Sequence, residues 1–496
     1  MSIEIKDWEE SMQRSLLEMI DNHKVERILD EAYSVLEKVG VLIENEAALH
    51  LLESADAKVD RKNRKAYFPR RLIESCIKSA PKSITVFDRY GEVAMLLEGN
   101  NIHFDPGSAA LNILDWETQR QRKPITQDLV DFSRLTHHLQ NLVAQSTGII
   151  SSDVPEEIGD RYRLFIALQH STKPIITGTF AHDAFDSMKE MLIAVRGSVE
   201  NLRQKPLAIF DCCPSPPLKW SNLTCQNLID CARAGIPAEL VSMPLTGATA
   251  PGTLAGALVQ HAAESLSGVV IHQLAKSGSP IIWGGSPAAF DMRHGTTPMG
   301  AIETMMIDAA YAKIGKYLEL PTHVYMALSD AKLLDSQAGL ETGIGAVIAA
   351  LSGINVISGP GMLDFESCQS LEKLVIDNEI CGMALRLVKG IELRDKMSDD
   401  LFGDIYDGEH FLTSPGTLKW LRDEFYFPSE VIDRANYQTW LATDRKTAGE
   451  RAHQKVNQIL QEIVPPALDH TIKNELEKIM LKDARKFGME KLPKQD

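Results

Sequence analysis

Hydrophobic and polar residues follow a repeating pattern from about residue 100 to about residue 390. Each repeat begins with a short apolar run that ends in Gly, Pro, Ser, Thr or Asp, and a segment of helical length follows it. Such runs are typical of strands buried on both faces, as in a parallel sheet that helices cover. Eight runs are present, at residues 102–107, 142–148, 174–180, 207–213, 238–244, 280–285, 322–330 and 354–361.

The spacing of these runs predicts a (β/α)8 TIM barrel. Their starts lie about 30 to 42 residues apart, which is the length of a strand, a helix and two loops. Eight such units need about 250 residues. An open doubly wound sheet is the alternative, but it commonly has fewer units and a glycine fingerprint in its first turn. No G-x-G-x-x-G follows the first run.

The chain divides into three predicted parts. Residues 1–95 form an N-terminal helical segment that packs on the barrel, residues 96–394 form the barrel, and residues 395–496 form a C-terminal helical segment. Both flanks are rich in charged residues at helical spacing, which is typical of helices that keep one face in solvent.

Composition excludes several classes of partner. The 496 residues are 44% hydrophobic and 24% charged, as in ordinary globular proteins, and the formal net charge is −16. This charge repels phosphate backbones and anionic lipids, so we expect neither nucleic acid nor membrane as a partner. The N-terminus has no basic start with an apolar centre, and a cytoplasmic location is predicted. We also expect a homo-oligomer, because the flanking helices are long.

The motifs that carry common catalytic groups are missing from the sequence. The seven cysteines do not form paired C-x2-C motifs, so no structural metal is predicted. Neither a phosphate-binding P-loop nor a G-x-S-x-G elbow is present. The D-x-x-H-G stretch at 291–295 differs from the D-x-H-x-x-G signature of proteins that carry a corrinoid. No tightly bound cofactor is therefore predicted.

Aromatic and acidic residues recur at the ends of the apolar runs. The carboxyl ends of barrel strands form the active-site face, so these residues should converge there. Ring faces and carboxylates together stabilise a quaternary ammonium cation from which water is excluded. For any one of them, filling of the barrel core is the simpler explanation. The residues concerned are Phe104, Asp105, Phe180, Phe210, Asp211, Trp283, Tyr325, Ser329, Asp330, Asp364, Phe365 and Glu366.

Three stretches resemble the trimethylamine methyltransferase family, and the likeness spans nearly the whole chain. They are FDRYG (87–91), SDAKLLDSQAG (329–339) and SGPGMLDFESCQSLEKLVIDNEI (358–380). The resemblance implies a barrel enzyme that moves a methyl group from a methylated amine to Co(I) of a separate small corrinoid protein. The cobalamin cofactor would therefore come with the partner protein.

The sequence contains no pyrrolysine, the residue that members acting on trimethylamine carry. In this respect it resembles the glycine betaine methyltransferases, whose substrates are quaternary amines. A quaternary ammonium already carries its positive charge and leaves as a neutral amine, so no general acid, general base or protein nucleophile is needed. The predicted substrate is therefore glycine betaine or a similar quaternary amine.

The hypothesis assigns roles to nine residues. Phe210, Trp283, Tyr325 and Phe365 form an aromatic cage, and Arg293, His294 or His323 holds the substrate carboxylate. The turn with Gly359 and Gly361 ends the eighth strand with little bulk, which would leave room for the corrin ring.

Two other functions remain open at the level of sequence. A non-catalytic betaine-binding protein would bind the same ligands without a corrinoid partner. A zinc-dependent corrinoid methyltransferase for methanol or thiols would share the barrel fold.

Overall fold

Eight parallel strands form the centre of the protein. The computed structural model describes residues 16–394, 411–443, 445–462 and 467–495. Five strands form one parallel sheet, in the order β15–β13–β11–β10–β9, and three form a second, in the order β17–β18–β6. Their bounds are β6 (His103–Asp105), β9 (Gln145–Ser146), β10 (Ile175–Gly178), β11 (Ala208–Cys212), β13 (Ala238–Ser242), β15 (Ile281–Gly285), β17 (His323–Tyr325) and β18 (Val356–Ser358).

The two sheets meet at both edges, and the predicted (β/α)8 barrel is confirmed. Each junction is one isolated parallel bridge, between Phe104 and Leu142 on one side and between Trp283 and Thr322 on the other. The last strand, β18, pairs with the first, β6. The eight strands therefore follow one another around a ring in chain order, and each corresponds to one of the eight apolar runs.

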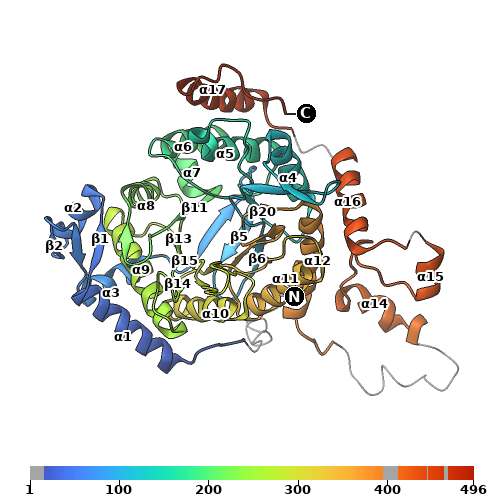
Figure 1. The fold of residues 1–496 in the computed structure, drawn as a ribbon, viewed down its shortest axis with the longest axis horizontal. Helices are drawn as coiled ribbons and strands as arrows, with labels where there is room; N and C mark the ends of the chain where they lie inside the picture. Colours follow the sequence, from blue (N-terminus) through green and yellow to red (C-terminus); the bar gives the residue numbers. More distant parts are fainter. Residues whose placement is uncertain (1–15, 395–410, 444, 463–466, 496) are drawn as a thin grey trace, which may run out of the picture.

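Helices surround this ring (Figure 1). They follow one another counterclockwise from α4 to α12 in this view, so right-handed β-α-β connections place the carboxyl ends of the strands toward the reader. Their bounds are α4 (Thr126–His138), α5 (Gly159–His170), α6 (Ala184–Arg196), α7 (Val199–Gln204), α8 (Asn222–Ala234), α9 (Leu254–Ala275), α10 (Ile302–Tyr317), α11 (Ser336–Leu351) and α12 (Leu371–Val388).

A β-hairpin plugs the amino-terminal end of the barrel. Strands β4 (Ile84–Phe87) and β5 (Val93–Leu97) pair with each other and pack against inward-facing residues of the ring. Those residues include Ile209 of β11, Ile282 of β15 and Val356 of β18. Because side chains alternate along a strand, the next inward positions toward the carboxyl end are Asp211, Gly284 and Ser358.

The sequence predicted a purely helical N-terminal part, but the structure shows helices together with strands. Helices α1 (Asn22–Lys38), α2 (Glu46–Ser54) and α3 (Arg70–Ser79) accompany β1 (Val41–Ile43), β2 (Lys58–Asp60) and β3 (Lys65–Tyr67), which form a sheet with β12 (Lys219–Trp220). The expected boundary at residue 95 falls inside β5. The hairpin of β4 and β5 closes the amino-terminal end of the barrel, so it belongs with the barrel and not with the N-terminal part.

Helix α9 is the one helix among the described residues that is long and apolar enough to cross a membrane. Of its most apolar window, 78% is buried inside the protein. Its contacts with α1, α3, α8 and the strands explain the apolar surface, which is that of a core helix.

The C-terminal helices lie along the outside of the barrel. They are α14 (Pro415–Glu424), α15 (Tyr437–Ala442), α16 (Ala448–Glu462) and α17 (His470–Lys486). Helix α16 packs on α12 and α4, and α17 packs on α5 and α6, whereas α14 and α15 stand to one side (Figure 1). The expected boundary at residue 395 lies outside the described residues. The oligomeric state stays a prediction.

Candidate active site

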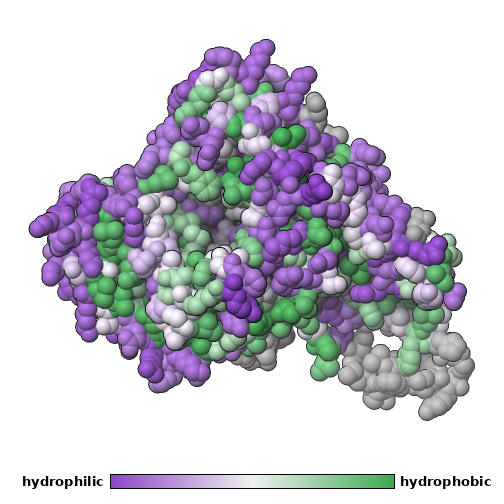
Figure 2. Space-filling model, viewed as in Figure 1, coloured by the Kyte–Doolittle hydropathy of each residue, from purple (hydrophilic) through white to green (hydrophobic). Residues whose placement is uncertain are grey.

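The carboxyl ends of the strands surround a hollow, which we call the mouth. Figure 2 looks onto it and shows hydrophilic residues at the bottom of a depression near the centre of this face. An apolar layer that includes Val241, Met299, Tyr325, Leu328 and Met362 lies buried around it. Short strand pairs extend the wall: β7 (Asn112–Asp115) with β8 (Arg120–Arg122), β14 (Leu245–Thr246) with β16 (Ala288–Ala289), and β19 (Met362–Leu363) with β20 (Cys368–Gln369).

Four polar side chains lie in a row across the floor of the mouth. His323 Nδ1 lies 2.6 Å from Glu239 Oε1, and His323 Nε2 lies 2.8 Å from Ser358 Oγ. Ser358 Oγ donates to Asp105 Oδ1 at 2.7 Å. All four residues are buried, and they come from β13, β17, β18 and β6. We call this set the floor chain.

Burial sets the charges of the floor chain. It lowers the pKa of His323 to about 4 and raises the pKa of Glu239 well above its usual value. His323 is therefore neutral at pH 7, and burial favours the neutral form of Glu239 as well. Because Ser358 gives its hydrogen to Asp105, His323 donates from Nε2, whereas its Nδ1 lies close to Glu239 without a hydrogen bond to it among the described residues.

Burial also raises the pKa of Asp105 to about 8, although His323 and the Ser358 hydroxyl oppose the shift. Asp105 Oδ2 has no hydrogen-bond partner among the described residues. The floor chain thus ends in a carboxyl group with one unused oxygen.

Two more carboxyl groups lie in the mouth, close to Asp105. Asp211 Oδ2 accepts the Tyr325 hydroxyl at 3.3 Å, and Ser108 Oγ lies 3.4 Å from the same hydroxyl. Burial raises the pKa of Asp211 well above its usual value and that of Glu366 to about 8. Asp211 Oδ1 and Glu366 Oε1 lack partners within the described part of the chain. Asp105, Asp211 and Glu366 therefore each keep an unused oxygen at one site, and the oxygens of Glu239 also lack a hydrogen-bond partner among the described residues.

Glu366 reaches the mouth from a strained turn between β19 and β20. Three consecutive residues, Asp364, Phe365 and Glu366, have φ angles of 51°, 57° and 65°. L-residues with side chains rarely adopt this left-handed conformation, and a bulky residue adopts it least readily. Lys332 Nζ lies 3.8 Å from the centre of the Phe365 ring and 3.5 Å from Asp364 Oδ1. Strain held in this way is common at functional sites.

Phe365, Arg293 and His294 line one cavity beside the mouth, with a volume of about 930 Å³. The side chains of Arg293 and His294 are 81% and 71% exposed, and both contact Asp291. Arg293 Nη2 lies 2.7 Å from Asp291 Oδ2, so this cation already has a counterion. His323 and Tyr325 instead face the carboxyl groups, with ring centres 4.7 Å apart.

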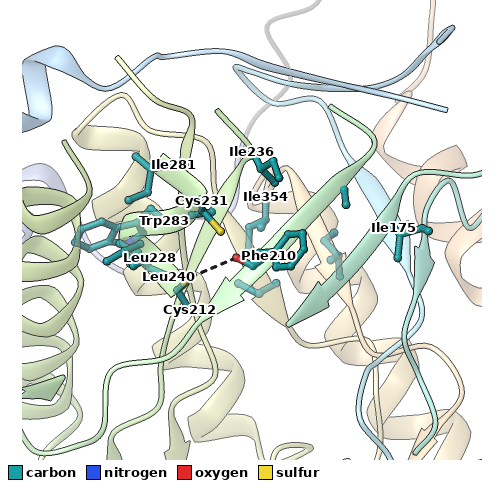
Figure 3. Packing of buried hydrophobic residues seen from close by; sticks show 14 of the residues in the cluster. Ile175, Phe210, Cys212, Leu228, Cys231, Ile236, Leu240, Ile281, Trp283 and Ile354 are labelled. Atoms are coloured by element: carbon teal, nitrogen blue, oxygen red, sulfur yellow. Dashed lines mark hydrogen bonds between the residues drawn. The ribbon is translucent and has the colours of Figure 1, made fainter. Parts of the chain in front are cut away.

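The structure does not bring Phe210 and Trp283 into the mouth. Both are fully buried between the strands and the helices, and Figure 3 shows them in one apolar layer with Leu228 of α8. Trp283 Nε1 donates to the Tyr311 carbonyl of α10, and Phe210 packs edge to face against Phe185 of α6. These two rings occupy outward positions of their strands, which is why the interior lacks them.

Gly359 and Gly361 are buried and do not form an open rim. Their φ angles are 132° and 87°, which favour glycine. A Cβ at Gly361 would lie 2.2 Å from Gln369 Oε1, and one at Gly359 would lie 2.9 Å from the Ala327 backbone. Asp377 Oδ2 accepts the Gly361 N–H at 2.7 Å. The turn therefore needs glycine for its internal packing.

Sequence reasoning missed Glu239 and Ser358. Glu239 interrupts an apolar run (AELVSMP) in which a buried acid needs a partner, and this signal was available. Among the described residues, no group of three or more His, Cys, Asp or Glu is arranged to hold a metal ion.

Comparison with known proteins agrees with this architecture. The structure of the monomethylamine methyltransferase (MtmB) of Methanosarcina barkeri aligns with a TM-score of 0.52, covering 95% of this chain and 89% of that one. The hydroxylamine complex of MtmB aligns with a TM-score of 0.53 over the same shares. Sequence identity is 11% in both cases, so the likeness concerns the fold alone.

Sequence relatives are more informative. Trimethylamine methyltransferase MttB of Desulfitobacterium hafniense (strain DSM 10664 / DCB-2) is 30% identical, with 92% of each chain covered. Glycine betaine methyltransferase of Desulfitobacterium hafniense (strain Y51) is 30% identical, with 95% of this chain and 98% of the relative covered. The family model described as trimethylamine methyltransferase (MTTB) matches residues 4–488. The chain therefore belongs to the trimethylamine methyltransferase family.

Proposed function

We propose that this methyltransferase moves a methyl group from a quaternary amine to the Co(I) centre of a separate corrinoid protein. The observation that carries the proposal is the set of three carboxyl groups with unused oxygens, Asp105, Asp211 and Glu366, beside Tyr325 in the barrel mouth. A permanent cation is the ligand that suits such a site, because its positive charge would stabilise the ionised form of carboxyl groups that burial keeps neutral.

A bound cation would change the state of these groups. Without it, burial keeps protons on Asp105 and Glu366 near neutral pH. A positive charge nearby lowers the pKa of a carboxyl group, so the ligand favours the carboxylate form. Tyr325 adds a ring within an apolar layer that excludes water. The ammonium group would therefore sit in a dry pocket with ionised acids on one side.

The residues of this chain then have two tasks. They orient one N–CH3 bond toward the open side of the mouth, and they keep water from the reacting atoms. The positive charge on nitrogen fades as the methyl group leaves, so acids that held the cation too tightly would slow the reaction. Carboxyl groups with raised pKa values suit this balance, because they can regain a proton once the neutral amine has formed.

The methyl acceptor would approach from outside. When the corrinoid protein is bound, its Co(I) supplies the nucleophile, and this chain needs none of its own. A broad macrocycle and its protein require an open surface with apolar contacts. Exposed apolar side chains follow the carboxyl ends of five strands around the mouth: Leu111, Phe180, Met243, Met292 and Leu333. The residues present fit such a partner.

Of the aromatic cage that the sequence predicted, we retain Tyr325 at the floor and Phe365 at the rim. Lys332 covers the Phe365 ring, so this ring must exchange its bound cation for the substrate. Phe210 and Trp283 would act only as support beneath the strands.

The direct test mixes the purified chain with a reduced corrinoid protein and a quaternary amine. Loss of the Co(I) absorbance that depends on both chain and amine supports the proposal. Amine binding without any loss of Co(I) would identify a betaine-binding protein instead, and activity that needs added zinc would favour the zinc-dependent class.

A further inference from the structure

Two buried arginines on α5 differ in how they are neutralised. Arg161 and Arg163 are 0% and 1% exposed. Arg161 forms ion pairs with Asp160, Asp183 and Asp483. Arg163 donates only Nη1, to the Thr147 carbonyl at 2.8 Å, whereas its Nε and Nη2 have no acceptor within the described part of the chain. One of the two cations is thus fully paired and the other has spare donors.

Arg163 lies beside the mouth. Thr147 follows β9, and Phe180, whose ring centre is 4.8 Å from the Arg163 guanidinium carbon, follows β10. Burial raises the pKa of Asp211, which belongs to the next strand, β11, and the positive charge of Arg163 opposes this shift. Asp160 and, to a smaller extent, Asp211 and Tyr325 favour the charged form of Arg163. The guanidinium therefore shares its electrostatic surroundings with the carboxyl groups of the site.

An unpaired guanidinium in this position is costly. Taking a cation out of water is repaid only when an anion and hydrogen bonds replace the lost hydration. Burial lowers the pKa of Arg163 to about 10, so the side chain still carries its charge at neutral pH. Asp160 is the acid that most favours the charged form of Arg163, but its oxygens already bind Arg161 and the Phe180 and Ala181 N–H groups. Asp211 adds little, because burial raises its pKa and one of its oxygens is engaged by Tyr325. A negatively charged ligand would remove this cost.

We propose that Arg163 binds the carboxylate of a zwitterionic quaternary amine, while the carboxyl groups of Asp211 and Glu366 face its ammonium end. The inference rests on the proposed function and adds the residue that recognises the anionic tail of the substrate. Arg163 would then be the residue that separates betaines from quaternary amines without a carboxylate. A guanidinium suits this role because its planar fork matches two carboxylate oxygens.

The alternative anchors from the sequence are less suited. Arg293 is exposed and already paired with Asp291, and His294 contacts the same carboxylate. His323 is neutral, its Nε2 is hydrogen-bonded to Ser358, and its Nδ1 lies 2.6 Å from Glu239 Oε1. Each of them would have to give up a partner before it could bind a substrate carboxylate.

The test measures binding to the isolated chain, so it does not depend on a corrinoid protein. Glycine betaine, carnitine and γ-butyrobetaine are compared with choline, which has the same trimethylammonium head and a neutral tail. Calorimetric titrations use the natural chain, Arg163→Met and Arg163→Lys, with Arg203→Met as a matched control on the exposed face of α7. Thermal unfolding without ligand is recorded for each protein.

Four results are expected. The natural chain binds at least one betaine more tightly than choline. Arg163→Met weakens betaine binding about thirty-fold or more, because a charged hydrogen-bonded contact is lost, but changes choline binding less than about three-fold. The same variant raises the melting temperature of the ligand-free chain, since it removes an unpaired buried charge. Arg163→Lys keeps the charge without the fork and falls between.

Several results would overturn the inference. They are unchanged betaine affinity in folded Arg163→Met, an equal loss for betaine and choline, or no betaine binding to the natural chain. If Arg163→Met does not fold, an unchanged preference for betaine in Arg163→Lys is also decisive against it. Arg163-dependent betaine binding without loss of Co(I) absorbance would leave this inference standing and would refute the proposed reaction.

Discussion

His323 Nδ1 lies 2.6 Å from Glu239 Oε1, and neither side chain is exposed to solvent. Burial favours the neutral forms of both groups, so the pair is best described as a neutral carboxylic acid beside a neutral imidazole, without a hydrogen bond between them. The hydrogen bonds run in one direction, from His323 through Ser358 to Asp105. The floor chain fixes the position of Asp105 and leaves its second oxygen for the ligand.

Replacement of Glu239 distinguishes a neutral pair from an ionic one. Glu239→Gln should retain nearly full stability, because the amide has nearly the same shape as the neutral acid and can also face His323 Nδ1. Glu239→Ala removes the polar group that faces this nitrogen and should lower the free energy of unfolding by about 1–3 kcal/mol. Urea unfolding at pH 7 measures both. Equal losses in the two variants would show that the carboxylate charge is required.

Asp105 makes stability depend on pH. Its pKa is about 8 in the folded protein and about 3.9 in an unfolded chain. The folded state therefore holds this proton more tightly, and the resulting stability is complete below pH 4 and is lost as the pH rises to 8. The slope approaches about 1.4 kcal/mol per pH unit within that range.

Asp105→Asn should remove this dependence. Urea unfolding between pH 5 and pH 9 is expected to show a steeper loss for the natural chain than for the variant. Parallel curves would mean that Asp105 does not hold its proton in the folded state.

Substitutions of Trp283 and Tyr325 should have different effects, the first on stability and the second on amine binding. Trp283→Ala removes a fully buried ring between β15 and the helices, which should cost about 3–5 kcal/mol of stability. Tyr325→Phe removes only the hydroxyl that contacts Asp211 and should mainly weaken amine binding. Thermal unfolding and calorimetric titration of both variants measure the difference. A stable Trp283→Ala variant with weakened binding would return this residue to the cage.

Phe365 should lower the stability of its turn while its ring aids methyl transfer. Phe365→Gly relieves the strain of a left-handed conformation. It should leave the free energy of unfolding unchanged or raise it by up to about 1 kcal/mol, with the melting temperature following. Phe365→Ala keeps the strain and serves as the control, and both lack the ring. We expect both to transfer methyl groups more slowly, and Gly to be the more stable. A less stable Gly variant would show that the turn is not strained.

The barrel was predictable because it follows from the spacing of apolar runs, which local composition determines. Which side chains of each strand point into the barrel was not predictable. Phe210 and Trp283 end apolar runs as Tyr325 does, but only Tyr325 points inward. The inward set is defined by contacts with the β4–β5 hairpin, such as those of Ile209 and Ile282, and these join parts of the chain far apart in sequence.

Some of the proposed binding residues were likewise predictable from the sequence and others were not. Acids at the run ends, such as Asp105 and Asp211, were visible in the sequence because strand ends converge in a barrel. Arg163 was not, because its importance depends on the absence of an acceptor around two of its nitrogens. Such an absence is a property of the folded chain, and the paired Arg161 nearby has the same local sequence context.

The most direct measurement of the central claim is the Co(I) absorbance of a reduced corrinoid protein mixed with this chain and a quaternary amine. The account predicts that the absorbance falls only when both are present, and that the amine loses one methyl group for each cobalt consumed. An unchanged Co(I) spectrum with every quaternary amine that the chain binds would contradict it.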